Sequence, residues 1–158
     1  MFRFLIFMAA TGASLLGLAS CATTAPRPPA AVATAAPANA LYNTFTYTAY
    51  TVVDLTEGEP PTEVQGVGGT LTLRPDGSYA KRLTITRPGS AAMHFDQDGR
   101  YTVTGDSIRF AFTDSKGADV QRGTYRLNPQ TQALTITILG YPTGNRGIYE
   151  LRAQPAGQ

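Results

Sequence analysis

His94 is the only histidine in the chain, and it stands in the segment MHFDQDGR together with Asp96 and Asp98. In an extended strand alternate side chains point to the same face, so these three would lie on one side. An imidazole and two carboxylates can bind a metal ion. Acidic residues beside a turn at Asp98-Gly99 also form an ordinary solvated face, and this is the interpretation we prefer. We therefore expect no metal site here.

Catalytic arrangements are not evident elsewhere in the chain. His94 would have to be the base of any Ser-His-Asp triad, and the sequence shows no nucleophile elbow or oxyanion loop. Glu57, Glu59 and Glu63 lie in one polar segment, which does not single out the paired carboxylates of a glycosidase. We therefore expect a protein that is not an enzyme and that has no cofactor.

Residues 1–20 have the layout of a targeting signal. They begin with one early positive charge, Arg3, and continue with an apolar stretch that ends in small residues. This arrangement is typical of a secretory signal peptide, and the apolar stretch is short for a transmembrane helix.

The single cysteine, Cys21, follows that stretch directly. The motif LASC at residues 18–21 resembles the bacterial lipobox. The resemblance implies cleavage before Cys21, a lipid on its sulfur and an acyl chain on its new amino group, which together anchor a protein stably. Ala22 in place of an aspartate implies the outer membrane of a Gram-negative envelope. The alternative is an ordinary signal peptide, cut near Ala19 or Ala22, with an incidental thiol.

Residues 21–40 predict a tether and residues 41–158 one small domain. After the cysteine, the first segment is almost wholly alanine, proline and threonine, which favours an extended spacer. Of the 13 basic residues, Arg3 and Arg27 precede residue 41, so 11 basic residues in the domain balance 11 acidic ones. This balance argues against nucleic acid as a partner, because phosphate binding needs a basic face.

The domain is predicted to be all-β. In ALTITIL, for example, Leu134, Ile136 and Ile138 alternate with threonines, and such runs are bounded by Gly, Asp, Asn or Pro turns. The predicted strands cover about 43–55, 66–74, 77–87, 92–104, 107–113, 119–127, 133–139 and 146–152.

A Gly-x-Tyr repeat indicates how the strands are connected. It occurs at Gly99, Gly123 and Gly147, 24 residues apart, and a further copy begins at Gly77. This period fits one hairpin per repeat, so it favours an antiparallel up-and-down meander. An eight-stranded meander can protect its edges only by closing into a barrel. A glycine on the inward face would leave room where the sheet bends.

The succession GTLTLRPDGSY, GRYTVTGDSIRFAF, RGTYRLNPQTQALTIT and NRGIYEL resembles the small lipocalin-like (calycin-type) domains of bacterial lipoproteins. It covers nearly all of residues 66–152. The resemblance implies an eight-stranded barrel that binds a small apolar or amphipathic molecule. One departure is the absence of tryptophan, because true lipocalins carry Gly-x-Trp on their first strand.

An interior of eight strands can be filled by side chains or can hold one small ligand. The inward set comprises the candidate ligand-lining residues Tyr47, Tyr79, Tyr101, Phe110, Phe112 and Tyr125, and beside them Phe45, Leu71, Leu73, Ile136 and Tyr149. Tyrosines would give an apolar pocket a few polar groups. The same residues could instead be a packed core, which would favour a structural or interaction module with an envelope protein as partner. The acidic loop 54–66 is either a lid or an exposed crossing.

Overall fold

The computed structural model describes residues 40–56 and 58–155, and these residues form an all-β domain. Its strands are β1 (Thr44–Val53), β2 (Thr62–Glu63), β3 (Val67–Leu73), β4 (Ser78–Ile85), β5 (Met93–Thr104), β6 (Ser107–Asp114), β7 (Gly117–Asn128), β8 (Ala133–Leu139) and β9 (Arg146–Ala153). None of these residues forms a helix that could span a membrane. The predicted signal peptide, Cys21 and the predicted tether up to residue 39 lie outside the described residues.

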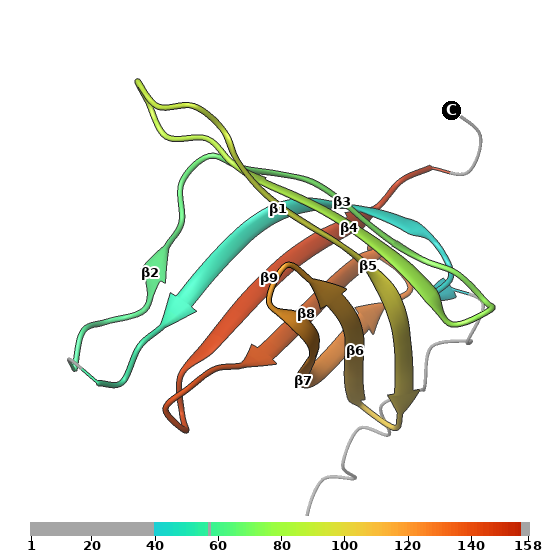
Figure 1. Cartoon of the computed structure of the whole chain (residues 1–158). Helices are drawn as coiled ribbons and strands as arrows, with labels where there is room; N and C mark the ends of the chain where they lie inside the picture. Colours follow the sequence, from blue (N-terminus) through green and yellow to red (C-terminus); the bar gives the residue numbers. More distant parts are fainter. Residues whose placement is uncertain (1–39, 57, 156–158) are drawn as a thin grey trace, which may run out of the picture. The chain divides into compact units, whose positions relative to one another are not determined.

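The strands form a closed antiparallel barrel (Figure 1). Each strand from β3 to β8 pairs with the next, β1 pairs with β3, and β1 also pairs with β9, so eight strands close the ring. The predicted eight-stranded meander is therefore confirmed. The predicted strand 133–139 coincides with β8, while β1 ends at Val53 and not at 55. The loop 54–66 contains the unpredicted strand β2, which pairs with the end of β1.

Because the hairpin turns of a meander alternate between the two rims, each rim has its own loops. One rim carries the chain entry at Leu41 and the turns after β3, β5 and β7, and we call it the closed end. Leu41 is buried there, and the Tyr101 hydroxyl donates a hydrogen bond of 2.9 Å to the carbonyl oxygen of Arg74. The other rim carries the loops after β1, β4, β6 and β8, and we call it the open end.

The core fills the closed end. Its fully buried side chains come from strands all around the ring and include Phe45, Leu73, Tyr79, Ile108, Leu134 and Leu151. They belong to one cluster of buried apolar residues, which is the usual content of a small barrel. At the open end the β4–β5 hairpin extends beyond its neighbours (Figure 1).

A bulge in β1 changes which of its residues face inward. Tyr47 is opposite Leu151 and Tyr50 is opposite Tyr149, with a shift of register between Tyr47 and Ala49. Leu151 and Tyr149 are two residues apart on β9 and share a face, so Tyr47 and Tyr50 also share the inner face. The bulge thus brings two tyrosines of one strand to Tyr149.

Gly-x-Tyr glycines lie where neighbouring strands approach closely. A Cβ on Gly123 would lie 1.9 Å from the carbonyl oxygen of Thr137, and one on Gly99 would lie 2.1 Å from that of Ala111. Both glycines therefore leave room for the backbone of the next strand, where a side chain would not fit. Gly77 differs, because it lies in the β3–β4 turn with a φ of 79°, a conformation that favours glycine.

Candidate functional site

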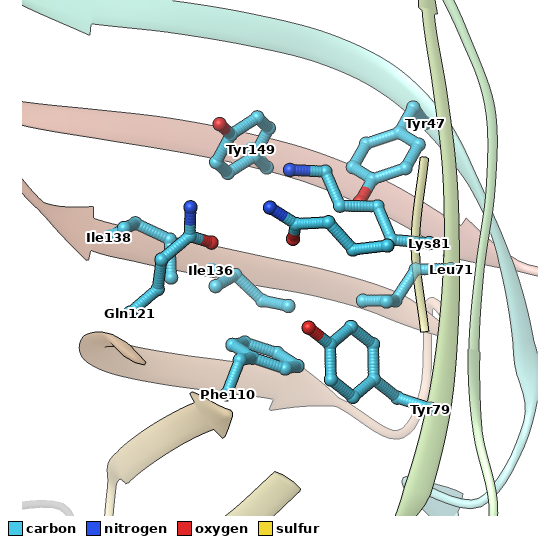
Figure 2. Close-up of a pocket in the computed structure, with 10 residues that line it drawn as sticks. Tyr47, Leu71, Tyr79, Lys81, Phe110, Gln121, Ile136, Ile138 and Tyr149 are labelled. Carbon is cyan, nitrogen blue, oxygen red and sulfur yellow. The ribbon is translucent and has the colours of Figure 1, made fainter. Parts of the chain in front are cut away.

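A small cavity lies inside the barrel, between the closed-end core and the open end (Figure 2). Its lining comes from every strand of the ring and comprises Tyr47, Leu71, Tyr79, Lys81, Gln97, Phe110, Gln121, Ile136, Ile138 and Tyr149. The volume of the cavity that is open to the centre of a water molecule is about 20 Å³. By that measure it holds about one water molecule, so side chains fill most of the interior.

Polar groups without partners face this cavity. The Tyr79 hydroxyl and the Gln97 Oε1 atom are buried and make no hydrogen bond. Tyr79 itself is only 2% exposed. A buried polar group without a partner costs folding free energy, about 1–3 kcal/mol for each unmade hydrogen bond. Such groups are uncommon in folded proteins, so their concentration at one cavity needs a reason.

Lys81 is the charged member of the lining, and only 9% of it is exposed. On the β-ladder it is opposite Leu71 on β3 and Gln97 on β5. Its Nζ atom lies 5.5 Å from the centre of the Tyr149 ring, toward which the side chain points in Figure 2. Burial lowers the pKa of Lys81 to about 8, because the charged amine has lost its water.

Three tyrosines form an aromatic wall beside Lys81. The Tyr50 and Tyr149 rings stack with centres 4.5 Å apart, and the Tyr47 ring meets Tyr149 edge-on at 5.8 Å. Burial raises the pKa of Tyr47 and of Tyr149 well above the ordinary tyrosine value. Tyr47 and Tyr149 are therefore neutral at physiological pH, and the wall offers hydroxyl groups and ring faces to whatever lies beside it.

The six predicted ligand-lining residues lie at different positions along the axis of the barrel. Tyr47, Tyr79 and Phe110 line the cavity. Tyr101 lies at the closed end, where its hydroxyl donates a hydrogen bond to the carbonyl oxygen of Arg74. Phe112 is buried and Tyr125 half-buried, both outside the cavity lining.

Sequence reasoning missed the polar residues of the cavity, Lys81, Gln97 and Gln121. Lys81 stands two residues after Tyr79 on β4, Gln97 two residues before Gly99 on β5, and Gln121 two residues before Gly123 on β7. The period-2 rule therefore puts all of them on the inner face. The signal was present, but a hydrophobic pattern does not record polar residues at inward positions.

His94, Asp96 and Asp98 lie on the outer face of β5 and are exposed. Asp98 forms an ion pair with Arg82 on β4, in which the Arg82 Nη2 atom donates to both carboxylate oxygens, at 2.9 and 2.8 Å. Within residues 40–56 and 58–155, no group of three or more His, Cys, Asp or Glu side chains could hold a metal ion.

The loop 54–66 is tied to the β8–β9 loop at the open end. Asn145 donates a hydrogen bond of 3.0 Å to Asp54 and accepts one of 2.8 Å from the backbone of Leu55. The Thr56 hydroxyl and amide hold the pKa of the Asp54 carboxyl below its usual value. Glu59 and Glu63 are exposed, and Glu57 lies outside the described residues.

An outer groove runs over β5, β6 and β7, with a volume of about 400 Å³. Arg109 on β6 and Arg122 on β7 are directly opposite each other on its floor. The other polar residues that line it are Thr102, Thr104, Ser107 and Thr124. Two like charges thus face each other on the wet side of the barrel.

No protein-family model matches this chain, and no curated protein matches its sequence. The case for a function therefore rests on the residues of the barrel itself.

Proposed function

We propose that the barrel binds one small amphipathic molecule without catalysis, with its polar head in the cavity and its apolar part toward the open end. The observation that carries this proposal is that two buried polar groups without a partner, the Tyr79 hydroxyl and the Gln97 Oε1 atom, lie at the cavity together with the buried Lys81. A bound head group would supply the missing partners and recover the cost of leaving them unpaired.

The inner face of the β4–β5 hairpin has the polarity that such a ligand needs. Next to the opposed pair Lys81 and Gln97 comes Leu83 opposite Phe95, and beyond it Ile85 opposite Met93. The β5 members of the two apolar pairs are exposed, Phe95 by 44% and Met93 by 39%. Four residues of strand span about 13 Å, so an apolar chain of roughly that length could follow this face.

The small volume of the cavity requires side chains to move when the ligand enters. About 20 Å³ admits a water molecule but not a carboxylate or an amide. Lys81, Gln97 and Gln121 have long, flexible side chains, and none of the three side chains holds a hydrogen bond to the other cavity residues. Their rotation toward the open end would enlarge the site without disturbing the packed closed end.

A packed interaction module is the second candidate, and the near-absence of free volume favours it. In that case the exposed apolar side chains of the open end, which include Leu55, Met93, Phe95 and Tyr141, would contact an envelope protein. Leu55 is 58% and Tyr141 94% exposed. Exposed apolar groups that gather at one rim are typical of a contact surface.

A lipid on Cys21 would hold the barrel at a bacterial membrane, preferably the outer one, and this remains a proposal from the motif LASC and the spacer that follows. Neither a cofactor nor a nucleic-acid partner belongs to the proposal.

The experiment is to prepare residues 22–158, the chain beyond the lipidated cysteine, under gentle conditions. Native mass spectrometry and organic extraction would then show whether a small molecule accompanies the protein. A stoichiometric adduct that leaves on denaturation would support the binding function. A clean mass, with no uptake from a panel of fatty acids and fluorescent apolar probes, would overturn it and favour the interaction module.

A further inference from the structure

Lys81 is a cation without an anion. The residues that line the cavity include no carboxylate, and the ion pair found within residues 40–56 and 58–155 joins Arg82 to Asp98 on the outer face. The titratable groups that face Lys81 are Tyr47 from β1, Tyr79 from β4 and Tyr149 from β9, all neutral.

Leaving a charge in such a place is costly. Proteins pair buried charges or neutralise them, because a charge in a low-dielectric interior loses its hydration. The π-face of Tyr149, 5.5 Å away, compensates Lys81 only in part. A methionine or leucine would fill the same inward position on β4 without this cost.

The polar atoms around Lys81 are mostly donors. The ammonium has three N–H groups, the Tyr79 hydroxyl is free to donate, and each of Gln97 and Gln121 carries an amide NH₂. The Gln97 Oε1 atom is unpaired, and a half-turn of that amide would present its NH₂ in its place. A carboxylate accepts at both oxygens, about four lone-pair sites in all, and so suits a set of donors.

We infer that the ligand of the barrel is a carboxylate-bearing amphiphile, and that Lys81 is the counter-charge for its carboxylate. This inference rests on the proposed binding function and specifies its ligand. The planar carboxylate is a compact head group, which suits a cavity that has room for about one water molecule and must widen to admit a ligand. The apolar chain of the ligand follows Leu83, Phe95 and Ile85 toward the open end.

The chain offers a direct readout, because Lys81 and Lys116 are its only lysines. Residues 22–158 labelled with [ε-¹³C]lysine will give two lysine signals, and Lys116→Met identifies them. The probes are octanoate and 1-octanol, which share a chain length and differ in charge. Lys81→Met removes the buried cation, and Lys116→Met removes an exposed one in the β6–β7 turn as the matched control.

Octanoate is expected to bind and to raise the pKa of Lys81 by about one unit or more, since a nearby anion favours the ammonium form. Lys81→Met should weaken octanoate binding about tenfold or more, while Lys116→Met leaves it unchanged. Octanol should bind without moving the pKa of Lys81, and its affinity should survive in Lys81→Met.

Two results would overturn the inference, and they differ. If octanoate and octanol bind equally well, and Lys81→Met weakens neither, the barrel binds amphiphiles but Lys81 is not a counter-charge. If neither probe binds to any of the proteins, the proposed binding function fails and the inference fails with it.

Discussion

The ring of Tyr79 lies over Gly99, the residue directly opposite it on the next strand. A Cβ on Gly99 would stand 3.0 Å from Cε1 of Tyr79 and 2.1 Å from the carbonyl oxygen of Ala111. Tyr79 also meets Phe110 edge-on, with ring centres 4.8 Å apart. The glycine thus makes room for an aromatic ring and for a neighbouring backbone at the same point.

Gly99→Ala should destabilise the barrel by about 2–4 kcal/mol, because the Ala111 carbonyl belongs to the backbone and cannot move aside as a side chain can. Chemical denaturation followed by far-UV circular dichroism measures the loss. Gly68→Ala on β3 is the control, since nothing lies within 4 Å of its Cβ. Equal effects of the two substitutions would contradict the steric explanation.

Lys81→Met should raise the free energy of unfolding at pH 7 by about 1–3 kcal/mol, because it removes an unpaired buried charge. The pH profile supplies a second signature. The folded-state pKa of about 8 is below the unfolded value of 10.5, so the unfolded chain binds more protons between these values. The stability difference between the parent protein and Lys81→Met should therefore change in favour of the parent by up to about 2 kcal/mol from pH 8 to about 10.

The measurement is urea denaturation at several pH values, with Lys116→Met as the control that should follow the parent protein. A stability difference between the parent and Lys81→Met that does not change over this range would show that Lys81 does not titrate there. The total stability of each protein should fall above about pH 9.5, because the four buried tyrosines keep their protons in the folded state and lose them in the unfolded one.

Four buried tyrosines should titrate late. Burial raises the pKa of Tyr79 and of Tyr101 to about 12, and it raises that of Tyr47 and Tyr149 still further. The ultraviolet absorbance of tyrosinate should therefore stop short of its full amplitude near pH 11 while the barrel is folded. In urea these four tyrosines should titrate near pH 10, the ordinary value for an exposed tyrosine. Full amplitude in the folded protein would show that these rings are accessible to solvent.

Arg122→Glu should stabilise the barrel by about 0.5 kcal/mol, because it turns the opposed pair with Arg109 from repulsive to attractive. Added salt should reduce the gain. Arg152→Glu makes the same change of charge opposite Thr46 and Ala133, where no such gain is expected. Thermal unfolding at low and high salt tests both variants, and a gain shared by both would reflect net charge alone.

Cys21→Ser should release the chain from the membrane and abolish labelling by radioactive fatty acid, if the motif LASC is a lipobox. Cell fractionation and immunoblotting follow the release. Ser20→Ala is the control, because it keeps a small residue before the cysteine. A Cys21→Ser protein that stays in the membrane and is still labelled would exclude lipidation at this residue.

Alternation of apolar residues was enough to predict the strands of the barrel. The period is short and local, so Leu134, Ile136 and Ile138 fall on the inner face of β8 whatever surrounds them. The β1 bulge could not be predicted in this way. One extra residue changes the face of everything after it, and the run from Tyr47 to Tyr50 reads equally well without the change.

The cavity was only partly predictable, because the alternating pattern of a strand shows which side chains point inward but not how far along the barrel axis each one lies. The position along the axis depends on the tilt and stagger of the strands, which are properties of the closed ring. Tyr101 and Tyr79 were predicted as neighbours in one lining, yet Tyr101 belongs to the closed end. Lys81 was missed for a different reason, because an inward cation contradicts the pattern that identifies the strand.

The pairing of β1 with β9 makes the fold a ring in which the position of the first strand is arbitrary. Phe45 is opposite Ala153, and the backbone N–H of Gln154 donates to the carbonyl oxygen of Thr44 at 2.8 Å. The two places where the chain enters and leaves the barrel are therefore adjacent. A short linker could join them, and a new break in the exposed β6–β7 turn at Ser115 would give a circular permutant with the same ladder of strands. A tether attached at that break would hold the barrel by its open end.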